Sequence, residues 1–530
     1  KRTYGPELMD AMRMLKRAAD PKNILNPGKI IEAPKMDANL RYGEAHRAYP
    51  WQSRLSFTRN GGLDVAIEQC NGQGLCRKDA GVMCPSYQAT RAEMHSTRGR
   101  ANLLRAMISG PGRAEPGTAT VPGLGSYDPE KVEAAAQALD LCLACKGCKA
   151  ECPSGVDMAK LKFAFQSEYY KTHRRQWRDY VFGYFHITAK LAASVAPLSN
   201  ALMEVALIKN IVAKVLGVTP HRSFPKFTGR RSKWLTTHLS DLPSKSRAVP
   251  GETVRHGEKV IFLSDVFARY VEPDTEQAAL DILSACGFDI YVLPILGAGA
   301  SFLSKGFIEQ ARDHAARMLG LLNQADPAGK AHIVGIEPPE IYTFKHDYID
   351  LLPGRVEEIY KRTANVWLLD EYLLRSDTFH DLRVVNRGSV IGSEANLPAK
   401  KVFFHPHCHQ RAEGLSPDGL PSGTSATLKL LRFCGYDVEL MDTGCCGMAG
   451  TFGYEAEHYE LSMKIGGLQL FPQIRELKTQ MDELKPGPPE VVSSGAACRL
   501  QIKQGTGVEA IHPIRLVAEQ VKKWKRHGTR

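Results

Sequence analysis

The stretch Cys142-Leu-Ala-Cys145-Lys-Gly-Cys148-Lys-Ala-Glu-Cys152-Pro153 carries four cysteines in the spacing C-x2-C-x2-C-x3-C-P. Three thiolates so closely spaced converge from one tight loop on a single cubane iron–sulfur cluster, whereas the fourth, which precedes proline, often binds a neighbouring cluster. Soft thiolate ligands also suit zinc, so a zinc knuckle is the alternative, but the Cys-Pro ending favours iron–sulfur. The spacing therefore predicts a [4Fe-4S] cluster at this loop.

A second run, Cys70-Asn-Gly-Gln73-Gly-Leu-Cys76 followed by Cys84-Pro85, has a similar layout with one cysteine missing. Cys70 and Cys76 occupy the first and third ligand positions, and Gln73 stands at the second. In paired runs the last cysteine of one run crosses to the cluster of the other. Cys84 is therefore expected to complete the cluster held by the first three thiolates of the later run, Cys142, Cys145 and Cys148.

The remaining thiolates form a second, incomplete set. Cys152 would face Cys70 and Cys76, and three thiolates leave open a cluster with a non-cysteine ligand, a three-iron cluster or no cluster. We therefore expect one cluster, with a second as the alternative. If Cys84 does not cross over, the single cluster would be held by Cys142, Cys145, Cys148 and Cys152.

The composition indicates about three or four domains. Of the 530 residues, 43% are hydrophobic and 24% charged, and the net charge of +12 accompanies no nucleic-acid-binding motif. The 13 cysteines are clustered, so we expect metal thiolates in a reducing cytoplasm and no disulfide framework. The most apolar region, 187–218, is interrupted by lysines and a glutamate, which predicts packed amphipathic helices and no transmembrane segment. Peripheral contact with the inner face of the membrane is the alternative.

From Lys259 onward the chain repeats itself. Lys259-Val-Ile-Phe-Leu and a helical pattern ending at Cys286-Gly have counterparts in Lys401-Val-Phe-Phe-His and a pattern ending at Cys434-Gly. Each copy reads as an apolar strand, an amphipathic helix ended by glycine, and a second strand. This alternation predicts an α/β unit with a parallel sheet, and we interpret Cys286 and Cys434 as small core residues.

The second copy carries cysteines and histidines in the segments that follow its strands. Loops after parallel strands lie at one edge of a sheet, so these side chains are expected to form a second metal site. The predicted ligands are Cys408, Cys445, Cys446, Cys498 and His409, with His405 and His407 as further candidates. The first copy has no cysteine at the corresponding places, which are Asp265, Val266, Gly297, Ala298 and Glu340.

Three stretches carry a resemblance to a known family. Tyr4-Gly5, a helical pattern over 6–19, Asp20-Pro21 and the turn 25–29 resemble the last turn of FAD-linked oxidases of the D-lactate and D-2-hydroxyglutarate dehydrogenase type. The stretch 83–101 is similar to the alpha-helical ferredoxin domain of fused enzymes of this type. The run 445–453 resembles the CCG domain of those enzymes, of heterodisulfide reductases, and of glycolate, glycerol-3-phosphate and lactate oxidoreductases, although Gly495 replaces the first cysteine of the usual C-x-x-C ending.

The order oxidase tail, ferredoxin, CCG, CCG resembles the C-terminal part of a bacterial FAD-linked oxidase and iron–sulfur fusion protein. This implies an FAD domain or partner subunit that oxidises a D-2-hydroxy acid, with Asn26 on the flavin side, and electron transfer to a quinone or a protein carrier. It also implies an iron–sulfur cluster or zinc at the second metal site. The alternatives are a subunit of a glycolate, glycerol-3-phosphate or heterodisulfide-type reductase, and a zinc-binding scaffold without redox function.

We expect an α+β multidomain protein, with a helical two-motif ferredoxin module followed by two α/β CCG repeats with parallel sheets. Within the module, helices are expected over 86–109, from Pro129 toward Cys142, and over 158–173. A homo-oligomer is left open. The predicted domains are an oxidase remnant over 1–35, the ferredoxin module over 36–175, a helical and basic connector over 176–250, a degenerate CCG-like repeat over 251–395 and a CCG repeat over 396–530.

Overall fold

The structure is a computed structural model that describes residues 4–36, 38, 46–109, 122–229, 258–387, 400–483 and 489–528. The chain forms two units. The first comprises Lys1–Ala48 and Ser109–Pro111, and the second comprises Tyr49–Ile108 and Gly112–Arg530.

The first unit contains the predicted N-terminal helix. Helix α1 spans Gly5–Ala19 and ends at Asp20. The Asp20 carboxylate accepts hydrogen bonds from the backbone N–H groups of Ile24, at 3.0 Å, and Leu25, at 2.8 Å. These bonds close the turn that Pro21, Pro27 and Gly28 predict. Asn26 follows this turn, exposed and with a positive φ of 45°.

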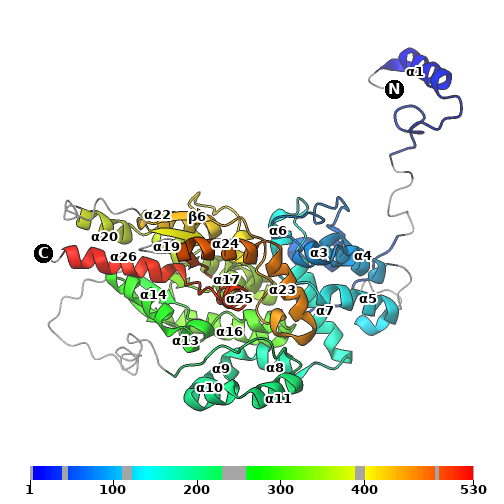
Figure 1. Cartoon of the computed structure of the whole chain (residues 1–530). Helices are drawn as coiled ribbons and strands as arrows, with labels where there is room; N and C mark the ends of the chain where they lie inside the picture. The colour runs from blue at the N-terminus through cyan, green and yellow to red at the C-terminus, as the bar shows by residue number, and fades with distance from the viewer. Residues whose placement is uncertain are drawn as a thin grey trace. The chain divides into compact units, whose positions relative to one another are not determined.

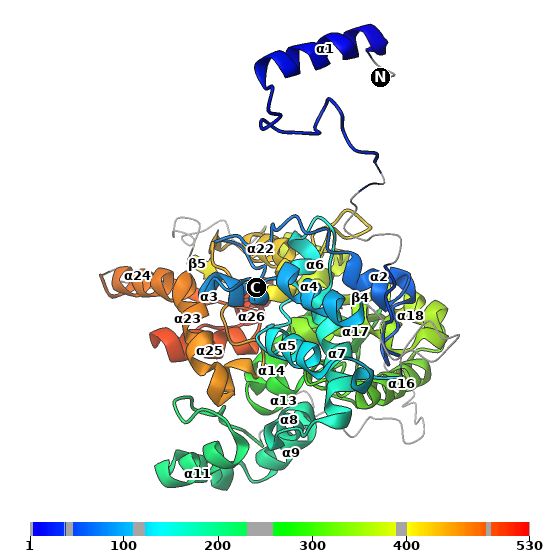
Figure 2. The ribbon, with the colours of Figure 1, turned by 90° about the vertical axis from the view of Figure 1, so that its right-hand side faces the viewer.

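The second unit begins with a helical module of six helices, in which α4, α5 and α7 pack against one another (Figure 2). The Asp128 carboxylate accepts from the Glu130 N–H and caps α5, as the Asp-Pro pair predicts. The helices of this module are α2 (Leu63–Glu68), α3 (Pro85–Thr90), α4 (Thr97–Ile108), α5 (Pro129–Asp140), α6 (Gly147–Glu151) and α7 (Met158–Thr172).

The prediction of a single helix over 86–109 is wrong, because the helical conformation is interrupted between α3 and α4. Arg91 ends α3 in the left-handed conformation, with φ at 59°. The break turns the start of α4 back toward Cys84, whose Sγ accepts a hydrogen bond from the Thr97 N–H at 3.0 Å. A thiol at the start of one helix therefore lies against the start of the next.

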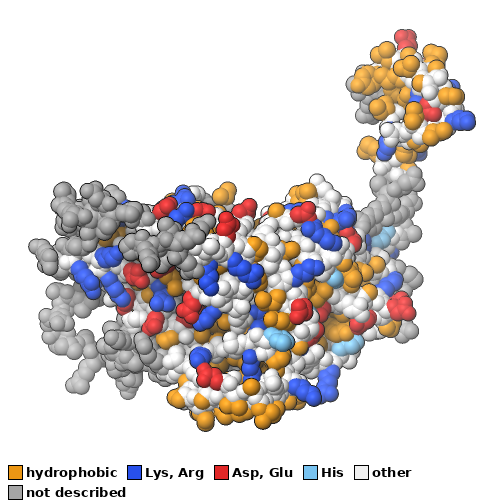
Figure 3. Space-filling model, in the orientation of Figure 1, with side chains coloured by type: hydrophobic (Ala, Val, Ile, Leu, Met, Phe, Trp, Pro, Cys, Tyr) orange, Lys and Arg blue, Asp and Glu red, His pale blue; other side chains and the backbone are white. Residues whose placement is uncertain are grey.

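A connector of four short helices follows and forms the lower edge of the second unit in Figure 1. They are α8 (Trp177–Gly183), α9 (Phe185–Ser194), α10 (Ala196–Glu204) and α11 (Ala206–Leu216). Among the described residues, no helix is long and apolar enough to cross a bilayer. The exposed side of α9–α11 is nonetheless apolar, as the orange patch in Figure 3 shows, and includes Ile187, Leu191, Leu198, Leu202, Leu207, Ile211 and Val215.

The two repeats each contain a parallel sheet, which confirms the α+β class. The first sheet has the order β2-β1-β3-β4, and the second has the order β6-β5-β7. Lys259 pairs with Asp289 in the first sheet as Lys401 pairs with Asp437 in the second, so the repeats share one register. The strands are β1 (Lys259–Phe262), β2 (Asp289–Val292), β3 (His332–Gly335), β4 (Val366–Leu368), β5 (Lys401–Phe404), β6 (Asp437–Leu440) and β7 (Glu490–Val492).

Helices cover these sheets, and one hydrophobic core spans both repeats. Its members include Phe262 of β1 and Phe404 of β5, and α14 packs against α26 beside it (Figure 1). Cys286 and Cys434 cap the ends of α14 and α22 and pack in this core. The first repeat has α13 (Val266–Tyr270), α14 (Pro273–Ala285), α15 (Ala300–Ser304), α16 (Ile308–Ala325), α17 (Pro338–Leu351), α18 (Val356–Thr363), α19 (Leu369–Leu373) and α20 (Asp377–Arg387). The second has α21 (Cys408–Arg411), α22 (Gly423–Phe433), α23 (Tyr459–Leu468), α24 (Leu470–Glu483), α25 (Ala496–Thr506) and α26 (Pro513–Gly528).

Candidate functional site

Four buried thiols from two distant parts of the helical module line one small cavity. They are Cys84, Cys142, Cys145 and Cys148. Cys84 precedes α3, Cys142 follows α5, and Cys148 lies in α6. The structure thus brings together the three cysteines of the later run with Cys84 of the earlier one.

The backbone that presents these thiols is held in an unfavourable conformation. Cys84, Ala144 and Lys146 have positive φ angles of 53°, 50° and 58°. Each costs on the order of 1–2 kcal/mol for a residue with a side chain, so the surrounding packing must hold these turns. A Cβ at Gly147 would lie 2.9 Å from Val82 Cγ1, so the loop also depends on a glycine at its closest approach to the earlier run.

Two buried cations beside this cavity have only neutral hydrogen-bond partners in the described part of the chain. Arg100 Nε donates to Ala138 O at 2.7 Å, and its second amino group donates to Ser86 Oγ at 2.8 Å. Lys162 Nζ donates to Cys142 O at 2.6 Å and to Asp140 O at 3.2 Å. No described carboxylate lies within ion-pair distance of either group, so each leaves a positive charge that calls for a nearby anion.

Three of the four thiols hold their protons tightly. Burial raises the pKa of Cys145 and Cys148 well above the usual range, and burial raises that of Cys84 to about 11. Without a metal these three thiols stay protonated, so metal binding there releases protons. Four thiolates around a cluster would also provide a negative counter-charge for Arg100 and Lys162. The donor set and its charges fit a [4Fe-4S] cluster.

The other three cysteines of the two runs lie outside this cavity. Cys70 and Cys76 are buried, and Cys76 Sγ accepts from the Arg98 N–H at 3.4 Å. Gln73, at the position of the missing cysteine, is exposed. Cys152 is partly exposed, and the turn after it approaches Gln69, next to Cys70.

The second thiol group lies after strands β5 and β6 and at the start of α25. It consists of Cys408, Cys445, Cys446 and Cys498. The thiols form a hydrogen-bonded chain: bonding from Cys445 lowers the pKa of Cys408 well below its usual range, and bonding from Cys445 and Cys498 does the same for the pKa of Cys446. Four thiols in mutual contact are a donor set for zinc or an iron–sulfur cluster.

Three histidines surround this group, and they take different positions. His405 has a ring nitrogen within 4.8 Å of the sulfur atoms of Cys446 and Cys498. His407 Nε2 lies 3.9 Å from Cys408 Sγ. His409, the predicted ligand, has its Nε2 3.3 Å from Ala144 O in the loop of the first thiol group. His405 and His407 thus both approach the thiols, and His409 contacts the loop of the first group; its role as a ligand stays a prediction.

The two thiol groups are neighbours. Helix α21, which begins at Cys408, packs against α6, and the charge of Cys408 acts on the pKa of Cys145. Gly495, which stands where the CCG pattern has a further cysteine, faces His407, since a Cβ there would lie 2.4 Å from His407 Cδ2. Histidine occupies the space that the missing cysteine would need.

The first repeat fills the equivalent region with carboxylates. Glu340 of α17 accepts from the Ala298 N–H at 2.6 Å, and Asp265 caps α13. Burial raises the pKa of Glu340 to about 7. Sequence reasoning missed Glu337, which accepts from the Ala496 N–H at 3.2 Å and whose pKa burial raises to about 8. Its only sequence signal is its position before the two prolines that begin α17.

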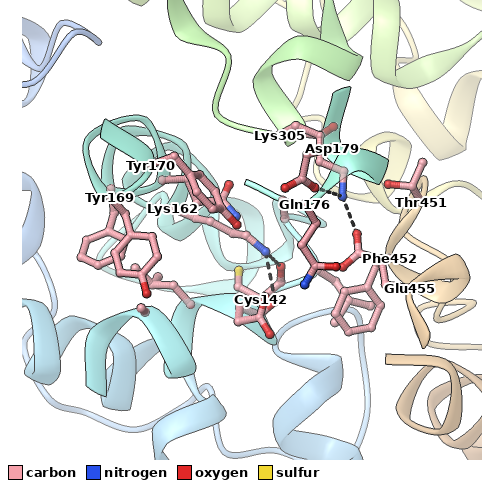
Figure 4. A pocket seen from close by; sticks show the side chains of 18 of the residues that line it. Cys142, Lys162, Tyr169, Tyr170, Gln176, Asp179, Lys305, Thr451, Phe452 and Glu455 are labelled. Carbon is pink, nitrogen blue, oxygen red and sulfur yellow. Dashed lines mark hydrogen bonds and ion pairs between the residues drawn. The ribbon is translucent and has the colours of Figure 1, made fainter. Parts of the chain in front are cut away.

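A larger pocket of about 280 Å³ opens beside Cys142 (Figure 4). Its walls come from α5, α7, α8, the end of α15 and the segment 449–457, and Cys142 lines both this pocket and the thiol cavity. No sequence pattern indicates the pocket, because its residues come from five separated segments.

Comparison with known proteins gives two family matches. Residues 66–156 match the family model of the 4Fe-4S dicluster domain, and residues 1–30 match that of the FAD linked oxidases, C-terminal domain. A segment similar to the end of FAD-linked oxidases thus precedes one similar to the 4Fe-4S dicluster domain, in the order that the motifs indicate.

D-2-hydroxyglutarate dehydrogenases are similar to this chain over nearly its whole length. The protein of that name from Escherichia coli is 27% identical over 98% of this chain and 50% of its own length, and that from Pseudomonas putida is 26% identical over 97% and 49%. One subunit of the anaerobic glycerol-3-phosphate dehydrogenase of Escherichia coli is 24% identical over 66% of this chain and 78% of its own length. The resemblance drawn from the motifs is confirmed, and the chain spans about half the length of the D-2-hydroxyglutarate dehydrogenases it matches.

Proposed function

We propose that this chain is the iron–sulfur electron-transfer part of a flavin-dependent D-2-hydroxy-acid dehydrogenase of the D-2-hydroxyglutarate or D-lactate type. An FAD domain or subunit would oxidise the hydroxy acid, and Asn26 is proposed to lie on the flavin side. The bound cluster would supply reversible one-electron transfer. The terminal acceptor would be a quinone or a protein carrier.

The observation that carries this proposal is the convergence of Cys84, Cys142, Cys145 and Cys148 around one cavity with two buried, uncompensated cations. We assign one [4Fe-4S] cluster to these four thiols. Cys70, Cys76 and Cys152 provide an incomplete second set, which supports a three-iron cluster or a cluster with a non-cysteine ligand. The name of the 4Fe-4S dicluster family supports two clusters.

The second thiol group is proposed to hold a further metal centre, zinc or iron–sulfur. Cys408, Cys445, Cys446 and Cys498 would bind the metal, with His405 as a fifth candidate ligand. Arg411 approaches this group, and its charge interacts with the thiols. The contact of α21 with α6 supports electron exchange between this centre and the cluster.

Peripheral contact with an anionic membrane is proposed for α9–α11. The exposed apolar side chains there are flanked by the exposed Lys190 and Lys214, the arrangement of an interfacial amphipathic surface. The lysines would therefore contact anionic lipid headgroups, and the apolar side chains would contact the acyl chains.

Metal analysis of protein purified without oxygen tests the central proposal. We expect iron and acid-labile sulfide, a brown colour, and an electron paramagnetic resonance signal after reduction. A colourless protein that contains zinc and no sulfide would instead support the zinc-binding scaffold. Counting the spin systems of the reduced protein then gives the number of clusters.

A further inference from the structure

The pocket beside Cys142 has flat aromatic side chains on two sides. Figure 4 shows Tyr169 and Tyr170 on one side, Phe452 on the other, and Cys142 with Lys162 between them. Phe452 is held in place by stacking on His458, with ring centres 4.2 Å apart. Tyr169 is itself stacked on His173, with ring centres 3.8 Å apart, so both aromatic walls are held in place beside a proposed cluster ligand.

Two residues that line the pocket also carry buried polar atoms without partners. Arg178 and Gln166 line the pocket, and among the described residues Arg178 Nε and Gln166 Oε1 are buried without a hydrogen-bond partner. Arg178 is deeply buried, since only 5% of its surface is exposed. Lys162 uses two of its three N–H groups on backbone carbonyls and keeps one. The pocket therefore offers two unused donors and one unused acceptor, which a ligand or water must satisfy.

We propose that this pocket binds the ring of a quinone and is the place where electrons leave the chain. A quinone oxygen would accept from Arg178 or Lys162, and the hydroxyl of the quinol product would donate to Gln166 Oε1. This inference rests on the proposed function and names its acceptor. It makes the Cys142 loop the exit for electrons.

The electrons and protons that the quinone takes up equal those that the proposed dehydrogenase releases. Oxidation of one D-2-hydroxy acid to the 2-oxo acid at the flavin releases two electrons and two protons. The electrons pass singly through the cluster held by Cys142 and its partners, and the quinone takes up both electrons with two protons from water at the mouth of the pocket, giving the quinol. No other oxidant or reductant is required.

The charges of the pocket argue against a nucleotide acceptor. Lys305 is paired with Asp179 and Glu455, and Arg178 with Glu457, so Lys162 is the one cation among the described lining residues without a carboxylate partner, too little charge for the phosphates of a dinucleotide. A nicotinamide ring takes up a hydride, whereas a cluster delivers single electrons. A quinone accepts electrons one at a time and carries no phosphate.

The main test narrows the pocket with the Thr451→Trp substitution. Thr451 lines the pocket and is partly exposed, and Ala456, exposed in the same segment and outside the pocket, provides the matched Ala456→Trp control. Binding of the quinone analogue 2-heptyl-4-hydroxyquinoline N-oxide is followed by quenching of its fluorescence. Reoxidation of the dithionite-reduced chain by menadione is followed at visible wavelengths, with ferricyanide as a comparison oxidant that has no quinone ring.

We expect Thr451→Trp to weaken analogue binding and slow reoxidation by menadione at least about tenfold, with ferricyanide oxidation and iron content unchanged. Ala456→Trp should stay within about twofold of the parent chain. Gln166→Leu, which keeps the side-chain volume, should weaken binding about threefold to tenfold and serves if the tryptophan variant does not fold. Equal behaviour of Thr451→Trp and Ala456→Trp, or no analogue binding, would overturn the proposal.

Two further measurements are needed. One distinguishes failure of the proposed function from failure of the pocket proposal, and the other distinguishes a dissolved quinone from one in the membrane. If the chain lacks iron and sulfide, the proposed function fails, but analogue binding still tests the pocket. Menadione in water and menaquinone in vesicles of phosphatidylglycerol distinguish a dissolved quinone from one in the membrane, and reduction of either in a pocket-dependent manner supports the proposal. Pocket-independent reduction of both contradicts it.

Discussion

Lys162 Nζ lies 2.6 Å from the carbonyl oxygen of Cys142, and no carboxylate of the described residues lies within ion-pair distance of it. Lys146, in the same loop region, differs because its ammonium lies 2.5 Å from Asp347 Oδ2. Both lysines are buried. Lys162 therefore brings a net positive charge to the cluster loop, whereas Lys146 brings an ion pair.

Replacement of Lys162 should make the cluster harder to reduce. The reduced cluster is the more negative state, so loss of a buried positive charge lowers its reduction potential. We expect Lys162→Met to lower the midpoint potential by roughly 50–100 mV, measured by a redox titration followed by electron paramagnetic resonance. Lys149→Met removes an exposed charge next to Cys148 and should shift the potential by less than about 20 mV. Equal shifts would show that burial of the charge does not matter.

The two predicted ligand sets differ in their fourth ligand, which is Cys84 in one and Cys152 in the other. Replacing each of these cysteines by serine distinguishes the two sets. If Cys84 crosses over, Cys84→Ser should reduce the iron and sulfide content by the equivalent of one cluster and remove its absorption. Cys152→Ser should then leave that cluster intact. Cys286→Ser is the matched control, since Cys286 ends α14 and belongs to neither thiol group. Cluster loss in Cys152→Ser with retention in Cys84→Ser would assign the consecutive set instead.

The glycine of the Cys445-Cys446-Gly447 run has a backbone role. Gly447 has a φ of 90°, and a Cβ there would lie 2.3 Å from Ser462 O. Gly447→Ala should therefore lower the free energy of unfolding by roughly 2–4 kcal/mol, measured by denaturant titration. Gly467→Ala, in α23 with open space around its Cβ, should raise it by about 0.5–1 kcal/mol. If both substitutions had the same sign, the close approach at Gly447 would be refuted.

Glu340 should give the stability of the protein a pH dependence near neutrality. Its pKa is about 7 in the folded chain against 4.5 for the ordinary side chain, so the folded state holds the proton more tightly. The stabilisation is complete below about pH 4.5 and is lost as the pH rises through about 7. Relative to the parent, Glu340→Gln should gain roughly 1–3 kcal/mol between pH 5 and pH 8, measured from unfolding curves. A pH-independent difference would contradict the raised pKa.

Much of the architecture could be predicted because it follows from local patterns. Lys259 and Lys401 begin equivalent strands, and glycine after Cys286 and Cys434 ends equivalent helices, so periodicity and helix-ending signals agree. The approach of Cys84 to the later run follows from the spacing of the two runs. Its role as a ligand is still a prediction.

The rest depended on contacts between distant segments. The break at Arg91 arises because Cys84 Sγ draws the Thr97 N–H toward it, which no local propensity reports. His405, His407 and His409 look equivalent in the sequence, yet their direction depends on how α21 packs against α6. Glu337 acquires its surroundings only when the two repeats come together.

The carboxylate of Glu340 also limits which side chains the first repeat can accommodate. A cysteine side chain introduced at Gly297 would begin 2.7 Å from that carboxyl group, and its backbone φ of 64° already disfavours any side chain. Restoring thiols to the first repeat would thus require several coordinated replacements. A single cysteine at Gly297 would therefore not create a thiol site there, because Glu340 would have to be replaced as well.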